Sequence, residues 1–362
     1  KFLELRQSRK TNEALKKSFA EVLDSGYYIL GPKLKQFEKE FAKYLGVKFC
    51  IGVGNGLEAI QISLMALGIG KGDEVITTPI SAVATTLAIL AVGAKPVFVD
   101  TTTDGLIDPN LISQAITKKT KAILPVHLYG ASADLKQIQN ICKKYHLYLI
   151  EDAAQAHGSK LDGKFLGTFG NLGCFSFYPT KNLGALGDGG AIVTNNKKLA
   201  KTCLEIRDYG QRKKYYHVRF GLNSRLDEIQ AAILTVKLST LEKENNERRL
   251  LATRYIKNLS RLPLEILKSK PTSDSCFHQF VIKVKKRNQL QKFLISKGIS
   301  TLIHYPKIIP DQPFLKPLYI NADLPISREF VKNILSLPLH PNLSVDQINY
   351  ICSSIKEFYK RV

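Results

Sequence analysis

A lysine stands in the stretch FSFYPTKNLGALGDGG (residues 175–190), between an aromatic-rich apolar run and a glycine-rich loop. Burial lowers the pKa of a lysine, and the neutral amine is a nucleophile towards an aldehyde, so Lys181 is a candidate for that chemistry. The glycines would let a flat molecule approach the backbone closely, and Ser176 on the preceding strand could offer a hydroxyl to an anion. The alternative is a solvated surface lysine, which is common in a chain with 40 lysines.

Two carboxylates follow an apolar run in LYLIEDAAQAHG (residues 147–158). Parallel sheets bind ligands at the carboxyl ends of their strands, where Glu151 and Asp152 are expected. A carboxylate buried there needs a cationic partner to stay ionised, and a protonated heterocyclic nitrogen would serve. Gln155 could then hydrogen-bond an adjacent hydroxyl. The alternatives are that Asp152 only caps the following segment and that His157 is structural rather than catalytic.

A glycine loop, GVGNGLEA (residues 52–59), precedes a helical apolar pattern. Gly54, Gly56 and Ala59 satisfy a loose dinucleotide-binding fingerprint. We reject that interpretation because Asp73 precedes a strand, whereas the acidic residue of a dinucleotide site ends one. A helix N-terminus that presents free backbone N–H groups to a phosphate explains the loop better, and a plain turn is the alternative.

The apolar period alternates between strand and helix over about the first 200 residues. We expect strands at 49–53, 73–78, 95–100, 121–126, 147–152, 173–178 and 189–194. We expect helices at 33–45, 57–67, 82–93, near 108–117 and at 132–145. Repeated strand–helix units with apolar strands predict a mostly parallel sheet with helices on both faces.

The pattern changes from about residue 225 onwards. Residues 225–259 form one long, charged helical pattern that would bridge two domains. Beyond it we expect a strand at 277–284 and helices at 287–298, 324–335 and 344–357. We therefore predict a large α/β domain at 1–240 and a smaller α+β domain at 241–362.

Composition argues against a membrane, disulfide or metal protein. The chain contains no run of 18 apolar residues, and KFLELRQSRK lacks the apolar core of a signal peptide. Six scattered cysteines, without CxxC or metal-ligand spacing, favour buried thiols in a reducing cytoplasm. The expected location is therefore cytoplasmic, with no metal and no membrane contact.

The formal net charge is +22 at pH 7, and nucleic-acid binding is one interpretation of it. The basic residues occur as scattered pairs rather than as a dense stripe with interleaved aromatics. We therefore expect a lysine-rich background and no nucleic acid partner, with a positive surface that steers an anionic small substrate.

The chain order of anion loop, strand-end aspartate and downstream lysine resembles the pyridoxal phosphate (PLP) enzymes of the aspartate-aminotransferase fold, called fold type I. The motifs EDAAQAHG, SFYPTKNLGALGDGG, RDYG, GLNSRLDEIQAA and HYP are together similar to the nucleotide-sugar aminotransferases of the DegT family. The resemblance runs from about residue 25 to 345 with its spacing intact. It implies a large α/β domain with a mostly parallel sheet, and a smaller C-terminal α+β domain.

The resemblance also implies a role for each matching residue. Lys181 would bind the cofactor covalently and move the proton between the sugar carbon and the cofactor. Asp152 would keep the pyridine nitrogen protonated, so that the ring acts as an electron sink, and Gln155 would contact the ring hydroxyl. The other matching positions are the phosphate cradle (Gly56, Leu57, Ser176), an asparagine that reaches the neighbouring subunit's phosphate (Asn223), and residues that arrange the substrate or the second subunit's contribution (Arg225, His304, Tyr305).

The Asn223 match implies an active homodimer with shared sites. One position departs from the family pattern, because Ala82 stands where an aromatic residue usually stacks on the cofactor ring. Either another side chain covers that ring face, or the packing there is looser.

We therefore expect a PLP-dependent aminotransferase with Lys181 as general acid and base. Glutamate would load the cofactor as pyridoxamine phosphate and leave as 2-oxoglutarate, and that form would aminate a keto sugar carried by a nucleotide diphosphate. The GNGLEA loop and PVHLYG (residues 125–130) resemble members that aminate carbon 3 of a 6-deoxy sugar (dTDP-3-keto-6-deoxyhexose type), in lipopolysaccharide or other surface polysaccharide biosynthesis.

Three alternatives remain beside this hypothesis. A carbon-4 aminotransferase would share most of the motifs, which also do not distinguish dTDP, UDP and GDP. A sugar 3-dehydratase is disfavoured because those relatives carry histidine where this chain has Lys181. A regulatory or binding protein could keep the fold without catalysis.

Overall fold

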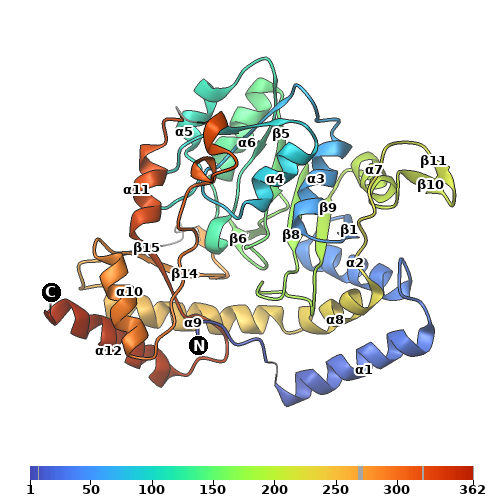
Figure 1. Cartoon of the computed structure of the whole chain (residues 1–362). Helices are drawn as coiled ribbons and strands as arrows, with labels where there is room; N and C mark the ends of the chain where they lie inside the picture. Colours follow the sequence, from blue (N-terminus) through green and yellow to red (C-terminus); the bar gives the residue numbers. More distant parts are fainter. Residues whose placement is uncertain (7, 268–271, 320–321, 362) are drawn as a thin grey trace.

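The computed structural model describes residues 1–6, 8–267, 272–319 and 322–361. Its centre is a seven-stranded sheet in the order β1-β9-β8-β5-β4-β2-β3 (Figure 1). The strands are β1 (Phe49–Val53), β2 (Glu74–Thr77), β3 (Lys95–Phe98), β4 (Thr120–Leu124), β5 (Tyr148–Asp152), β8 (Leu172–Ser176) and β9 (Gly190–Thr194). Strand β9 runs antiparallel to both neighbours, and the other pairings are parallel. The prediction of a mostly parallel sheet is confirmed.

Successive residues of the strands enter two different apolar clusters, because side chains alternate across a sheet. Ile123 and Leu149 pack with α2, α6 and α8, whereas Leu124 and Ile150 pack with α3, α4 and α7. The helices are α1 (Arg9–Ser25), α2 (Pro32–Leu45), α3 (Gly56–Ala66), α4 (Ala84–Ala91), α5 (Pro109–Ile112), α6 (Leu135–Tyr145), α7 (Lys197–Arg207) and α8 (Glu228–Leu238), with short 3-10 turns at Ser113–Ala115 and Leu128–Gly130. Helices therefore cover both faces, as predicted.

The C-terminal part builds a second, antiparallel sheet in the order β12-β14-β15 around its own core. Tyr255 of α9 stacks on Phe280 of β14 with ring centroids 4.7 Å apart. The elements are α9 (Leu241–Leu259), β12 (Glu265–Ile266), β14 (Phe280–Lys283), α10 (Arg287–Ser296), α11 (Pro325–Asn333), β15 (Ile334–Leu337) and α12 (Val345–Arg361), with 3-10 turns at Ile309–Asp311 and Lys316–Leu318. We retain the domain boundary near residue 240 as a proposal.

The single helix expected over 225–259 is wrong, because the chain forms α8 and α9 with a break at Ser239 and Thr240. The Ser239 hydroxyl donates to the carbonyl of Val236, and the Thr240 hydroxyl donates to that of Lys237. Hydroxyls that bond to nearby carbonyls compete with helical backbone bonds and promote such breaks.

Three short pairings lie outside the apolar pattern. The hairpin of β10 (Gln211–Lys213) and β11 (Tyr216–His217) projects beyond α7 (Figure 1). Strand β6 (Lys160–Leu161) pairs with β7 (Lys164–Phe165) and with β13 (Ser273–Asp274), which returns from the C-terminal part. These strands are too short to leave a period in the sequence.

All six cysteines are buried free thiols, as predicted. Within the described ranges, each helix is too short or too polar to span a bilayer.

A carboxylate from α8 caps the beginning of α2. The N-cap residue of α2 is Gly31, which has no side chain to accept the first helical N–H groups. Glu228, 1% exposed, accepts hydrogen bonds from the backbone N–H groups of Gly31 (2.8 Å), Lys33 (2.8 Å) and Leu34 (2.9 Å). The negative charge also lies at the positive end of the helix dipole.

We expect Glu228→Gln to lower the free energy of unfolding by about 2–3 kcal/mol, because a charged acceptor is lost from a buried site. Chemical denaturation monitored by circular dichroism measures this change. Asp227→Asn, one residue away and exposed, is the matched control and should change stability by less than about 0.5 kcal/mol. Equal effects of the two substitutions would contradict the capping role.

Candidate active site

The last two residues of β5 send carboxylates to opposite faces of the sheet. Glu151 is fully buried. Its oxygens accept hydrogen bonds from the backbone N–H groups of Phe169 (2.6 Å), Gly170 (2.7 Å) and Gly167 (2.8 Å), and lie 3.0 Å from His127 Nε2. Glu151 therefore anchors the turn before β8, and the neighbouring carboxylate is the one free for a ligand.

Asp152 is 5% exposed and lies on the α3 and α4 side of the sheet. Its Oδ2 accepts a hydrogen bond from Thr85 Oγ1 of α4 at 2.7 Å. Its Oδ1 accepts a hydrogen bond from the backbone N–H of Ala154 at 3.1 Å. This contact is the local capping that the sequence offered as an alternative role for Asp152. Capping therefore accounts for one oxygen only, and the other is held by a side chain from a different element.

Lys181 lies in the loop between β8 and β9. Burial lowers the pKa of its ammonium group, and the charge of Asp152 opposes that shift in part. The backbone N–H of Lys181 donates to the carbonyl of Tyr178 at 2.8 Å, which closes a turn. A Cβ on Gly184 would lie 2.5 Å from the carbonyl oxygen of Pro179, so the loop needs glycine there to fold back this tightly. The lowered pKa is consistent with the amine predicted from the sequence, whose catalytic role stays a prediction.

The glycine loop leads directly into α3, and Asn55 caps that helix by accepting the N–H of Glu58 at 2.9 Å. A Cβ on Gly56 would lie 2.6 Å from Cβ of Ser176, so the helix N-terminus abuts the end of β8. Leu57 packs its side chain against the core below. The helix N-terminus thus brings backbone N–H groups close to a serine hydroxyl, which is a combination suited to a phosphate, and we call this place the cradle.

The rejection of a dinucleotide site is consistent with the fold. Asp73 precedes β2, and its carboxylate accepts the N–H of Gly70 at 3.0 Å within a turn. It is therefore committed to the turn rather than placed at a strand end.

The segment around His304 and Tyr305 meets the Asp152 loop through Gln155. The side-chain Oε1 of Gln155 accepts the N–H of Tyr129 at 2.7 Å, and its Nε2 donates to the Tyr305 hydroxyl at 3.2 Å. His304 Nδ1 lies 2.8 Å from the Ser336 hydroxyl of β15. Residues from both sheets therefore converge on the edge that carries the lysine.

Asn223 and Arg225 are not brought into this cluster. Asn223 is exposed, while the adjacent Ser224 turns inward and accepts the N–H of Gly54 at 3.0 Å. Arg225 lies over the ring of Tyr209, 5.3 Å from its centroid, and pairs with an aspartate at the base of the β10–β11 hairpin. Ala82 is partly exposed in the turn before α4.

Asn182, directly after the lysine, was not identified from the sequence. Its Nδ2 donates to Asn245 Oδ1 (2.8 Å) and to the carbonyl of Cys276 (3.0 Å), so its Oδ1 accepts from His278 Nδ1 (3.1 Å). Asn245 in turn donates to the carbonyl of His157 at 2.8 Å. Asn182 thus ties the lysine loop to α9 and to the segment before β14, and through Asn245 to the loop after Asp152. Its contact partners lie 63 and more residues away, so no local motif marks it.

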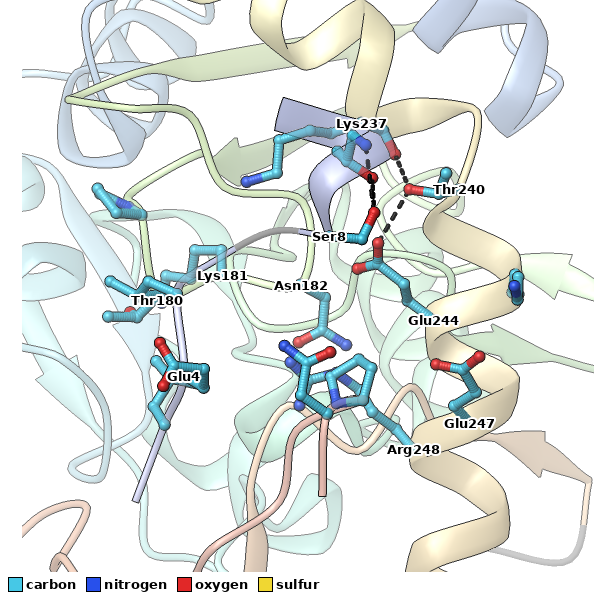
Figure 2. Close-up of a pocket in the computed structure, with 17 residues that line it drawn as sticks. Glu4, Ser8, Thr180, Lys181, Asn182, Lys237, Thr240, Glu244, Glu247 and Arg248 are labelled. Carbon is cyan, nitrogen blue, oxygen red and sulfur yellow. Dashed lines mark hydrogen bonds between the residues drawn. The ribbon is translucent and has the colours of Figure 1, made fainter. Parts of the chain in front are cut away.

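A cavity of about 250 Å³ lies behind the lysine loop (Figure 2). Lys181 and Asn182 line one side, Glu244 and Arg248 of α9 line another, and Ser8 contributes from the N-terminal segment. The loop is therefore bordered by polar groups on the side facing α9.

Residues 9–356 match the model of the DegT/DnrJ/EryC1/StrS aminotransferase family. The chain belongs to this family. A Geobacillus stearothermophilus protein named as a pleiotropic regulatory protein is 46% identical over 345 residues, which are 94% of this chain and 93% of that protein. A dTDP-3-amino-3,6-dideoxy-alpha-D-galactopyranose transaminase from Aneurinibacillus thermoaerophilus is 43% identical over 359 residues, 99% of each chain.

The structure of this aminotransferase superposes on a crystal structure of DesV from S. venezuelae in complex with a ketimine intermediate. The TM-score is 0.98 at 40% identity, and the match covers 100% of this chain and 99% of DesV. Solved members of the family carry pyridoxal phosphate or its amine form. The protein is therefore a PLP-dependent enzyme of the aspartate-aminotransferase fold.

Three features of the site fit this cofactor. The buried carboxylate of Asp152 matches a protonated ring nitrogen, and the Lys181 amine has a lowered pKa. The cradle at Gly56 is so close to Ser176 that a methyl group would clash, which leaves backbone N–H groups for the phosphate. When bound, PLP supplies an electron sink for the transfer of the amino group.

Three histidines near the lysine are held in the neutral form. Burial, with a further contribution from the nearby Lys181, lowers the pKa of His157 to about 3 and that of His304 to about 4. The same two causes lower the pKa of His278 well below its ordinary value. The site therefore has few competing positive charges around its amine at neutral pH.

We expect the stability of the cofactor-free protein to be complete above pH 6.5 and to fall as the pH drops towards 4. The unfolded chain takes up protons on these histidines over that range, whereas the native chain does not. His157→Phe preserves the packing against Phe175 and Phe177. It should reduce the slope of the free energy of unfolding against pH by about 1.4 kcal/mol per pH unit. Chemical denaturation at a series of pH values measures this slope. His217→Gln, on the exposed β11, is the control, and an unchanged slope in His157→Phe would refute the assignment.

Proposed function

We propose that this protein transfers an amino group from glutamate to a nucleotide-linked keto-deoxy sugar at carbon 3. The observation that carries this proposal is a buried Asp152 and a Lys181 with a lowered pKa, together at one sheet edge in a member of a sugar aminotransferase family. The substrate class is supported by the dTDP-3-amino sugar transaminase named above, at 43% identity over nearly the whole chain.

Each site residue has a defined task in this proposal. Lys181 Nζ, whose pKa is lowered by burial, takes a proton from the donor carbon and returns one to the sugar carbon. Asp152 holds the proton of the ring nitrogen, and Gln155 contacts the ring hydroxyl beside Tyr305. The N–H groups of Gly56 and Leu57 and the Ser176 hydroxyl bind the phosphate. His304 and Tyr305 bind the sugar at the junction of the two sheets.

A homodimer with shared sites is part of the proposal. Asn223 is exposed on its own chain, which fits contact with the phosphate of a second subunit. The nearby hairpin also exposes large rings, with Tyr215 at 81% and Phe220 at 80%. Such exposed aromatic groups favour a surface that is covered by a partner. Arg225 lies at the base of this hairpin, where it would act across the interface. The six free thiols support a reducing, cytoplasmic setting.

Regulation without catalysis is the second candidate, and the name of the 46% identical pleiotropic regulatory protein favours it. The catalytic candidate explains more of the chain. A protein with no turnover has no use for a desolvated lysine beside a buried carboxylate, since both carry an energetic cost. Amination at carbon 4 instead of carbon 3 is an alternative that substrate tests distinguish from our proposal.

We expect the purified protein to give a visible absorption band with PLP, which glutamate removes with release of 2-oxoglutarate. Lys181→Ala should bind the cofactor without this reaction, because the proton-transferring amine is absent. Absorption spectroscopy and a 2-oxoglutarate assay measure both. A wild-type protein that neither binds PLP nor releases 2-oxoglutarate would end the enzymatic proposal and leave the regulatory one.

Mixed assemblies provide the control for this experiment and test the shared site. Lys181→Ala and Asn223→Ala subunits, each inactive or weak alone, should regain activity when refolded together. One site of the mixed dimer then has an intact lysine and an intact partner asparagine. Failure to complement would contradict the proposed arrangement of subunits.

We expect amination of 3-keto nucleotide sugars and at least tenfold weaker kcat/KM for 4-keto isomers, because the two keto groups present different atoms to Lys181 Nζ. A panel of dTDP- and UDP-linked keto sugars, with products identified by mass spectrometry and NMR, measures this. Amination at carbon 4 alone would refute the position but leave the transaminase chemistry intact.

A further inference from the structure

The geometry points to Thr85 as a positioning residue that orients the carboxylate of Asp152 towards the ring nitrogen of bound PLP, with Ser81 supporting it from behind. This inference rests on the role proposed above for Asp152. Neither residue stood out in the sequence, because α4 is an ordinary apolar helix in its pattern.

Thr85 lies in the first turn of α4 and is 1% exposed. Its Oγ1 is 2.7 Å from Asp152 Oδ2, the distance of a hydroxyl that donates to a charged carboxylate. An ionised carboxylate has no proton to give, so Thr85 is the donor. The bond joins two elements that are 67 residues apart in the chain.

Ser81 completes a relay of two hydroxyls. Its Oγ is 2.8 Å from Thr85 Oγ1, and it is 4% exposed. Since the single hydroxyl proton of Thr85 goes to Asp152, Ser81 must donate to Thr85. Such chains of hydrogen bonds polarise one another and strengthen the last bond, which here is the bond to the carboxylate.

Thr85 supplies one of two hydrogen bonds that the Asp152 carboxylate accepts within the described ranges. The other comes from the backbone N–H of Ala154 at 3.1 Å. The titratable groups around it are Lys181, Tyr305 and Cys174. Burial raises the pKa of Tyr305 to about 12 and that of Cys174 well above its usual range, so both are neutral. Without Thr85, Oδ2 of Asp152 would lose the donor that fixes it, and the carboxylate would hold the ring nitrogen less well.

The next residue of α4 is a matched control. Thr86 is fully buried, and its hydroxyl has no hydrogen-bond partner within the described part of the chain. Valine has nearly the same shape as threonine, so Thr85→Val and Thr86→Val remove one hydroxyl each from neighbouring positions. They differ in whether that hydroxyl reaches Asp152.

The test compares the binding of PLP with that of 1-deaza-pyridoxal phosphate, in which a carbon replaces the ring nitrogen. Titration of the cofactor-free protein, followed by absorption, gives both affinities. We expect Thr85→Val to weaken PLP binding about tenfold and to leave the affinity for the analogue unchanged. Thr86→Val should change neither affinity, and Thr85→Ser, which keeps the hydroxyl, should restore PLP binding.

Ser81→Ala provides a second route if Thr85→Val fails to fold. It should weaken PLP binding about threefold with the same selectivity, because it removes the donor behind Thr85. Equal weakening of PLP and the analogue by Thr85→Val or Ser81→Ala would mean a structural role only and would overturn the inference. So would unchanged PLP binding in both variants. A wild-type protein that binds the two compounds equally would overturn this inference and the role of Asp152, whereas release of 2-oxoglutarate would still support the transaminase.

Discussion

The active site depends on the opposite directions taken by two consecutive carboxylates at the end of β5. Glu151 is satisfied within the protein, where it fixes the turn that leads into β8. Asp152 lies on the other face, where each carboxylate oxygen accepts one hydrogen bond and can still accept another from a ligand. A slip of one residue in the register of β5 would exchange the two, because side chains alternate along a strand. The pairing of β5 with β8 therefore sets both the anchor and the chemistry.

Around this pair, burial lowers the pKa of one amine, and the charge of Asp152 opposes that shift in part. The lysine is desolvated, and the three histidines near it are neutral because they are buried as well. The chain as a whole carries a formal charge of +22. Local burial thus lowers the pKa of the reactive amine in a strongly basic protein, and this effect is independent of the long-range field.

The sequence was sufficient for the features that are local or periodic. Lys181, Asp152 and the loop at Gly56 each follow a strand that can be recognised from its apolar pattern, and strand ends of a parallel sheet meet at one edge. The contacts that support them could not be predicted in this way. The bonds of Thr85 and Asn182 join residues far apart in the chain, and they use common side chains without a motif. The break between α8 and α9 was hidden because serine and threonine are compatible with a helical pattern until their hydroxyls find a carbonyl.

The carboxylate of Glu228 has a consequence for the order of folding during synthesis. It reaches back 197 residues to the first turn of α2, and β1 has its sheet partner in β9, far along the chain. When the ribosome has made the first helices and the first strand, these elements still lack the groups that complete them. Strand β1 can pair once β9 has left the exit tunnel, but α2 acquires its cap only after residue 228 has emerged. In nascent chains that end before residue 228, the first turn of α2 therefore lacks this cap.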